Sequence, residues 1–134
     1  HNNKLGVLLE LDCVTDFVAR TDEFKELAHK ISLQLAAMGA RFVSRDLVPQ
    51  EKIEKEKEIY AEQVKESGKP AHIIEKIVES KLESFYKENC LLEQEYVFES
   101  GKTINDLIVE LISKTGENIK VKKFVRWQVG ESDS

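Results

Sequence analysis

Apolar and polar residues alternate near both ends of the chain. Residues 5–13 place an apolar side chain at every second position, and residues 119–129 repeat this alternation with Lys123 as its one exception. A period of two is typical of a β-strand that buries one face. Leu8 interrupts the polar side of the first segment, which indicates that its second face is partly covered too. Residues 41–44 predict a further short strand or a sheet edge.

The last alternating segment contains the one tryptophan of the chain. Trp127 falls in phase with Val125 and Val129, whereas Arg126 and Gln128 fall on the opposite side. We therefore expect the Trp127 ring to pack in the core rather than to recognise a partner.

Two other segments carry apolar residues at helical spacing. Residues 22–38 follow Thr21, a favourable N-cap residue, and residues 104–115 follow Thr103, which forms a capping-box-like pattern with Asp106. Each segment ends at a glycine, which is typical of a helix C-terminus. Both segments predict helices that pack one face inward.

Residues 49–88 predict two helices joined by a turn at Gly68-Lys69-Pro70. The first of these helices is dense in Glu and Lys, and its apolar stripe is thin, so it buries a narrow seam rather than a core face. So short a turn predicts an antiparallel helical hairpin that protrudes from the body. Two interpretations stay open: the hairpin is a solvated spacer, or it is an arm that touches a partner or a second copy.

The order of these elements predicts the fold class. Strands stand at both ends of the sequence and helices lie between them, so the strands must pair across a long separation. We predict a single α+β domain over residues 1–134. It has a small, mostly antiparallel sheet of about three strands, with helices on one face and the protruding hairpin.

The composition narrows the classes of partner. The 134 residues include 25 acidic and 20 basic side chains, which gives a formal net charge of −5. This balance argues against a general nucleic-acid binder, which needs a basic face. No apolar run approaches the length of a membrane span. We expect no direct nucleic-acid partner and no membrane partner.

Familiar catalytic and metal-binding patterns are not found in the sequence. Cys13 and Cys90 lie far apart and form no disulfide framework, so we expect two reduced, partly buried thiols. No glycine-rich phosphate motif and no Cys- or His-based metal motif occurs. The carboxylates are plentiful but spread along the helices. We therefore expect no catalytic residue, no metal and no cofactor, and favour a protein that is not an enzyme.

A large aromatic residue lies where the first strand pattern gives way to the first long helix. Phe17 follows Thr15 and Asp16 in a polar junction that gives the ring little reason to be there for folding alone. Two interpretations follow from the pattern: the ring packs under the helix, or it is offered to a partner.

Five separated segments, in order along the chain, resemble the translation elongation factor Ts family. Cys13–Arg20 resembles the family signature, and Leu5–Glu10 is similar to its first core strand. The remaining similar segments are its hairpin turn, its Leu-Leu-Glu-Gln segment and its closing strand, at Ser67–Pro70, Leu91–Gln94 and Val125–Glu131.

The resemblance implies a guanine-nucleotide exchange factor for elongation factor Tu that acts in translation elongation. In this family the Thr-Asp-Phe-Val segment reaches into elongation factor Tu beside the nucleotide. Carried over, Phe17 wedges between partner side chains, Asp16 supports the loop and contacts the partner, and Thr15 and Val18 shape the loop. The wedge displaces elements of elongation factor Tu that hold Mg²⁺ and the phosphates, so GDP leaves. The expected location is the cytoplasm, or the matrix or stroma of an organelle.

The chain departs from the family pattern at two positions beside the signature. Asp12 stands where Asn is common, and Val14 stands where the family usually has Glu, so this chain has no acidic side chain at that position beside the signature. The family also carries an N-terminal docking module, and no such module precedes His1. We therefore expect a short, single-core form, and because short-form members are dimers, the resemblance also implies a homodimer as a second partner.

Three functions of different classes remain at this stage. The first is an exchange factor core that acts on a translational GTPase. The second is a structural or dimerisation module without exchange activity. The third is a hydrolase that uses scattered carboxylates, and no motif supports it.

Overall fold

The computed structural model describes residues 4–130 of the chain. The chain start at His1 and the polar tail Glu131–Ser134 lie outside the described residues. The elements in chain order are β1 (Leu5–Asp12), α1 (Asp16–Ala19), α2 (Asp22–Met38), the 3₁₀ turn η1 (Arg45–Leu47), α3 (Gln50–Lys65), α4 (Ala71–Asn89), the 3₁₀ turn η2 (Leu91–Glu93), α5 (Ile104–Thr115) and β2 (Lys120–Gln128).

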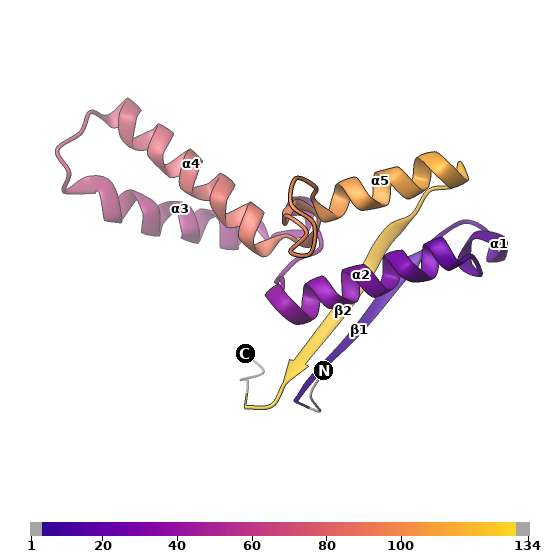
Figure 1. Cartoon of the computed structure of the whole chain (residues 1–134). Coiled ribbons are helices and arrows are strands. Elements are labelled where there is room, and N and C mark those ends of the chain that lie inside the picture. Colours follow the sequence, from indigo (N-terminus) through magenta and orange to yellow (C-terminus); the bar gives the residue numbers. More distant parts are fainter. Residues whose placement is uncertain (1–3, 131–134) are drawn as a thin grey trace.

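A two-stranded antiparallel ribbon joins the two ends of the described chain. Helices α2 and α5 pack on one face of this ribbon, and the hairpin of α3 and α4 projects away from it (Figure 1). The predicted α+β class with a protruding antiparallel hairpin is therefore confirmed.

The sheet has two strands within residues 4–130, fewer than the three expected. Phe42, in the segment predicted as a third strand, makes only an isolated parallel bridge with Cys90. The chain then enters η1 after Ser44, so the extended stretch is too short to build a ladder.

The prediction that Trp127 packs in the core is wrong. Glu10 pairs with Lys123 but Leu11 pairs with Val121, so strand β2 has one extra residue at this point. One extra residue moves every following side chain to the other face of the ribbon. Trp127 is therefore 54% exposed, on the face away from the helices.

The outer face of the ribbon is open rather than partly covered. Leu8, opposite Val125 in the ladder, is 63% exposed. The inner face is formed instead by side chains that pack on the core: Val7, Leu9, Leu11, Val121 and Phe124.

The main core forms between α2, α5 and the inner face of the ribbon. Ile31 and Leu35 of α2 and Ile104 of α5 are completely buried. The side chains of Thr21 and Thr103 cap the two helices as the sequence predicts, and Thr103 forms a full capping box with Asp106.

Two buried glutamines tie the end of α2 to the segment that follows α4. Gln34 donates to Gln94 Oε1 and to the Glu95 carbonyl, and its own oxygen accepts from the Val97 N–H. Gln94 donates to the Gly39 carbonyl and to a carbonyl at the end of α4. Both amides have partners for donor and acceptor atoms, so the pair fixes these segments without leaving an unsatisfied polar group.

The base of the hairpin has a smaller apolar cluster of its own, called here the hinge cluster. It consists of Val48, Leu82, Phe85, Tyr86 and Cys90, with Phe42, Ile53 and Tyr60 packed against it. Pro49 and Pro70 stand immediately before α3 and α4, as their fixed φ angles favour. Most of α3 beyond this cluster is exposed, in agreement with its thin apolar stripe. No helix within the described residues is long and apolar enough to cross a bilayer.

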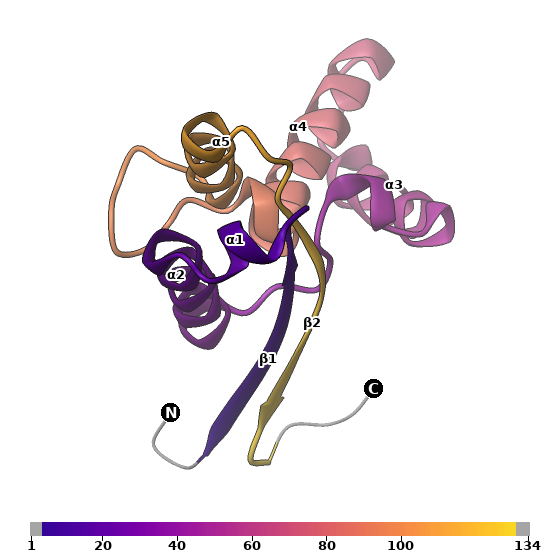
Figure 2. The same ribbon diagram turned by 90° about the vertical axis from the view of Figure 1, so that its right-hand side faces the viewer.

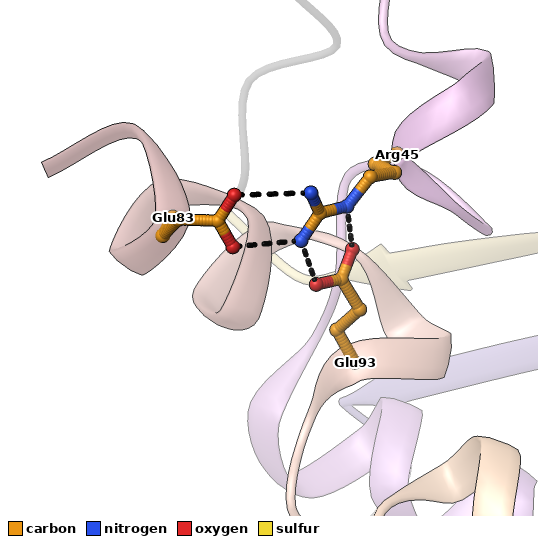
Figure 3. A network of polar contacts seen from close by, with 3 residues as sticks. All are labelled: Arg45, Glu83 and Glu93. Atoms are coloured by element: carbon orange, nitrogen blue, oxygen red, sulfur yellow. Dashed lines mark hydrogen bonds and ion pairs between the residues drawn. The ribbon is translucent and has the colours of Figure 1, made fainter. Parts of the chain in front are cut away.

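One arginine adds a polar clasp beside the hinge cluster (Figure 3). Arg45 donates to both carboxylate oxygens of Glu83 on α4 and to both carboxylate oxygens of Glu93 on η2, at 2.6–3.1 Å. Its guanidinium also lies 4.4 Å from the centre of the Tyr86 ring. These contacts raise the pKa of Arg45 and lower that of Glu83, so the clasp stays ionised at neutral pH.

Candidate partner-binding site

Helix α1 lies at the end of the molecule opposite the hairpin (Figure 1). A view along this end shows α1 between the end of β1 and the start of α2 (Figure 2). The four residues of α1 were predicted as part of a junction and not as a separate helix. The four site residues predicted from the sequence, Thr15–Val18, are its N-cap and its first three positions.

The ring of Phe17 is 86% exposed. The interpretation that it packs under the helix is therefore excluded. Asp16 is exposed beside it, and Val14, one residue before the N-cap, is 70% exposed. Burying one such aromatic ring is worth about 1.5–3 kcal/mol, so the ring is an unused source of binding energy in the free chain.

Val18 points the other way, into the main core. Its side chain is 7% exposed and belongs to the same cluster as Phe24 and Leu27 of α2. Val18 is therefore the one of the four predicted residues that is buried, and it anchors the turn from which Phe17 projects.

The backbone of α1 is hydrogen-bonded at its C-terminal end. The Thr21 N–H and hydroxyl both donate to the Val18 carbonyl, at 3.0 and 2.7 Å, and the same hydroxyl accepts from the Phe24 N–H. Thr21 is thus the N-cap of α2 and a tie to α1 at the same time. The backbone from which the Phe17 ring projects is thus fixed relative to the core.

The N-terminal end of α1 is held by a residue that sequence reasoning missed. The Thr15 N–H donates to Glu117 Oε1 at 2.9 Å, and the Thr15 hydroxyl donates to Glu117 Oε2 at 2.6 Å. The two residues are 102 positions apart, and Glu117 follows the glycine that ends α5. The sequence marked that glycine as a helix end and carried no sign of the contact.

Cys13 lies beside this contact, and its thiol donates to the Thr15 carbonyl at 3.3 Å. Burial and the nearby Glu117 carboxylate raise the pKa of the Cys13 thiol above its ordinary value. Cys90 is fully buried in the hinge cluster, and burial raises its pKa to about 11. Neither cysteine is in a disulfide. Over residues 4–130 no group of three His, Cys, Asp or Glu side chains is arranged to hold a metal ion.

The site is therefore a projecting aromatic ring on a hydrogen-bonded turn, with an acidic neighbour. Such a ring suits contact with another protein, because aromatic anchors that fill a partner's pocket carry much of the energy of protein interfaces.

Comparison with known proteins identifies the family of the chain. The family model described as elongation factor TS matches residues 1–131. The chain belongs to the elongation factor Ts family. It is 63% identical to elongation factor Ts of Fervidobacterium nodosum over 131 residues, which are 98% of this chain and 66% of that protein.

Other members of the family are about as similar. Elongation factor Ts of Thermotoga neapolitana is 61% identical over 97% of this chain and 65% of its own length. The protein of that name from Coprothermobacter proteolyticus is 60% identical over 96% of this chain and 65% of its own length. The chain thus spans slightly under two thirds of the length of these relatives.

The segments that resemble elongation factor Ts lie at structurally distinct places. Ser67–Pro70 lies at the turn between α3 and α4, as expected. Leu91–Gln94 is the junction at the hairpin base, where Leu91 is fully buried, Glu93 meets Arg45 and Gln94 joins the buried amide pair.

Proposed function

We propose that the chain is the core of a guanine-nucleotide exchange factor that binds elongation factor Tu with GDP and promotes GDP release during translation elongation. Membership of the elongation factor Ts family supports the proposal. The observation that carries it is the Phe17 ring, 86% exposed on a turn that is hydrogen-bonded at both ends. This function places the protein where elongation takes place, in the cytoplasm or in an organelle.

In the proposed mechanism Phe17 enters elongation factor Tu beside the Mg²⁺ and phosphate site. Asp16 contacts the partner at the rim, while Thr15 and Val18 hold the turn. A ring fixed by a rigid scaffold is a better wedge than a ring on a mobile loop, because little conformational freedom is lost on binding.

Exchange of this kind needs no acid, base or metal on the factor itself. The factor binds the distorted or nucleotide-free form of elongation factor Tu more tightly than the GDP-bound form. By linkage, the bound factor lowers the affinity of elongation factor Tu for GDP by the same ratio by which bound GDP lowers its affinity for the factor. The nucleotide and its Mg²⁺ belong to elongation factor Tu, so a site built for contact and not for catalysis suits the task.

A nucleotide-release assay tests this function. Elongation factor Tu loaded with a fluorescent GDP analogue is mixed with the chain, and the release rate is followed at increasing chain concentration. Release should accelerate with the parent chain and slow by about 10- to 100-fold with Phe17→Ala, the usual size of a lost aromatic hot spot. The matched control is Phe98→Ala, which removes an exposed phenylalanine before α5. Equal release by Phe17→Ala and the parent would contradict the proposal.

We also infer that a second copy of the chain pairs through the outer face of the ribbon. Leu8, Val125 and Trp127 form an exposed apolar surface there, and Leu8 lies directly opposite Val125. Contiguous apolar surface is typical of protein interfaces. Analytical ultracentrifugation should find a dimer that Trp127→Glu dissociates, whereas Ile59→Glu on the exposed side of α3 leaves it intact. A monomeric parent chain would exclude this pairing.

A further inference from the structure

We infer that Glu117 is a positioning residue for the Phe17 wedge. The inference rests on the proposed exchange function and adds to it a residue outside the Thr-Asp-Phe-Val segment. Glu117 contacts neither the ring nor, in this account, the partner. It acts through Thr15.

The contact is bidentate and joins two residues that are 102 positions apart in the sequence. One carboxylate oxygen of Glu117 accepts the backbone N–H of Thr15 at 2.9 Å, and the other accepts its hydroxyl at 2.6 Å. Hydrogen bonds to an ionised carboxylate are about twice as strong as neutral ones. Two of them from one residue fix both the position and the rotation of Thr15.

The Glu117 side of the contact is itself built into the fold. Gly116 adopts φ 74° and ψ 6°, a left-handed conformation that ends α5 and turns the chain toward β2. The Glu117 N–H then donates to the Thr115 hydroxyl at 3.2 Å, and that hydroxyl donates to the Leu111 carbonyl of α5 at 3.0 Å. Ile119, two residues on, is buried in the main core. Glu117 is therefore held between two elements that do not depend on α1.

Thr15 connects Glu117 to α1, because it is the N-cap residue of this helix. Because its hydroxyl proton goes to Glu117, its oxygen is left to accept the Val18 N–H, at 3.4 Å, as the N-cap. A helix of four residues cannot sustain itself, since nucleation of an isolated turn is unfavourable. Its direction, and that of Phe17, is set by the cap at one end and by Val18 and Thr21 at the other.

Cys13 gives an independent reporter of the same carboxylate. After burial, the negative charge of Glu117 is the largest cause that raises the pKa of this thiol. If Glu117 lies there in solution, neutralising it should lower the pKa of Cys13. Cys90 is fully buried, so a thiol reagent should react with Cys13 first.

The test uses three variants in the release assay: Glu117→Ala, Glu117→Gln and Glu110→Ala. The last is the matched control, because it removes an exposed carboxylate from α5. Glu117→Ala should lower the saturating release rate by about 10-fold and change the half-saturating concentration by less than about 3-fold. Glu117→Gln keeps one acceptor and should recover most of the rate. Glu110→Ala should accelerate GDP release from elongation factor Tu as much as the parent chain does.

A double-mutant cycle with Thr15→Ala separates positioning from general disturbance. Thr15→Ala removes the hydroxyl contact with Glu117 and leaves the backbone N–H contact in place. If Glu117 acts through Thr15, adding Glu117→Ala to Thr15→Ala should therefore lower the rate further by clearly less than the about 10-fold lost in the parent background. Additive losses, or a parent-like rate for Glu117→Ala alone, would overturn the inference.

Two measurements on the free chain do not depend on the partner. In Glu117→Ala the amide of Val18 should exchange its hydrogen at least about 10-fold faster while amides of β2 are unchanged. In Glu117→Gln the pH profile of Cys13 modification should shift to lower pH. If the parent chain fails to accelerate GDP release from elongation factor Tu, the exchange function is refuted. These two measurements then test the contact between Glu117 and Thr15 by themselves, and unchanged values would refute that contact too.

Discussion

The two ends of the molecule project from the same core but are held in different ways. The hairpin is long and is anchored by an apolar hinge cluster, to which Arg45 adds a polar clasp. The Phe17 turn is short and is anchored by one buried valine, with Thr21 and Glu117 supplying the rest through hydrogen bonds. Apolar packing is thus the main anchor of the hairpin, and hydrogen bonds are the main anchor of α1. We expect substitutions in the hinge cluster to lower stability, and substitution of Phe17 to slow GDP release without lowering stability.

The largest effect on stability should come from Phe85→Ala in the hinge cluster. Phe85 is buried and makes an edge contact with Tyr86, so its loss leaves a cavity and should reduce the free energy of unfolding by about 3–5 kcal/mol. Urea denaturation measures this directly. A loss no larger than that of Arg45→Gln would show that the polar clasp, and not the apolar cluster, holds the hairpin.

Phe17→Ala should give the opposite result for a residue of the same type. Its ring is exposed, so the free energy of unfolding should stay within about 0.5 kcal/mol of the parent. GDP release should nevertheless slow by about 10- to 100-fold. Urea denaturation measures the free energy of unfolding, and the release assay measures the rate of GDP release. A large loss of stability would mean that the ring packs on the protein in solution.

Arg45→Gln should have a moderate effect at the hairpin and none on GDP release. Partly exposed ion pairs add little, so the loss of stability should be well below that of Phe85→Ala. Arg45 lowers the pKa of Glu83 from its ordinary value of 4.5, and a lowered carboxyl pKa stabilises the fold only while the group is ionised. The stability gap between parent and variant should therefore be constant near neutral pH and narrow below about pH 4.5. A gap that stays constant down to pH 3 would contradict this account of the clasp.

The smallest effect should come from Val14→Glu, which restores the usual family residue beside the wedge. Val14 is exposed and its backbone lies next to Thr15, so the change leaves the fold intact. A surface charge contact should lower the half-saturating chain concentration by about 2- to 3-fold at low salt and lose this effect at high salt. Val14→Gln is the control of equal size. An equal gain with Val14→Gln would show that charge is not the cause.

Local patterns predicted most of the elements and pointed to the Phe17 junction as the candidate site. The caps at Thr21 and Thr103, the hairpin turn and the position of Phe17 all depend on neighbouring residues, which a single sequence displays. The exposure of Phe17 was left open by the pattern, because a polar junction allows both a packed and a projecting ring. Its direction is set by Val18, which the core buries.

The errors arose where distant residues decide the outcome. The extra residue in β2 changes which face Trp127 occupies, and its one sign in the sequence was Lys123 breaking the alternation. Residues 41–44 form a single bridge because their partner is the end of α4, not a strand. The contacts of Arg45 and Glu117 join residues far apart in the chain, so no local spacing could reveal them.

The central claim is that Phe17 is exposed in the free chain and buried in elongation factor Tu. A Phe17→Trp variant in a Trp127→Phe background carries a single tryptophan at the wedge. Its fluorescence should be quenched readily by acrylamide in the free chain and become strongly protected when nucleotide-free elongation factor Tu is added. The variant must first be shown to accelerate GDP release. Equal quenching with and without elongation factor Tu, in a variant that retains exchange activity, would contradict the account.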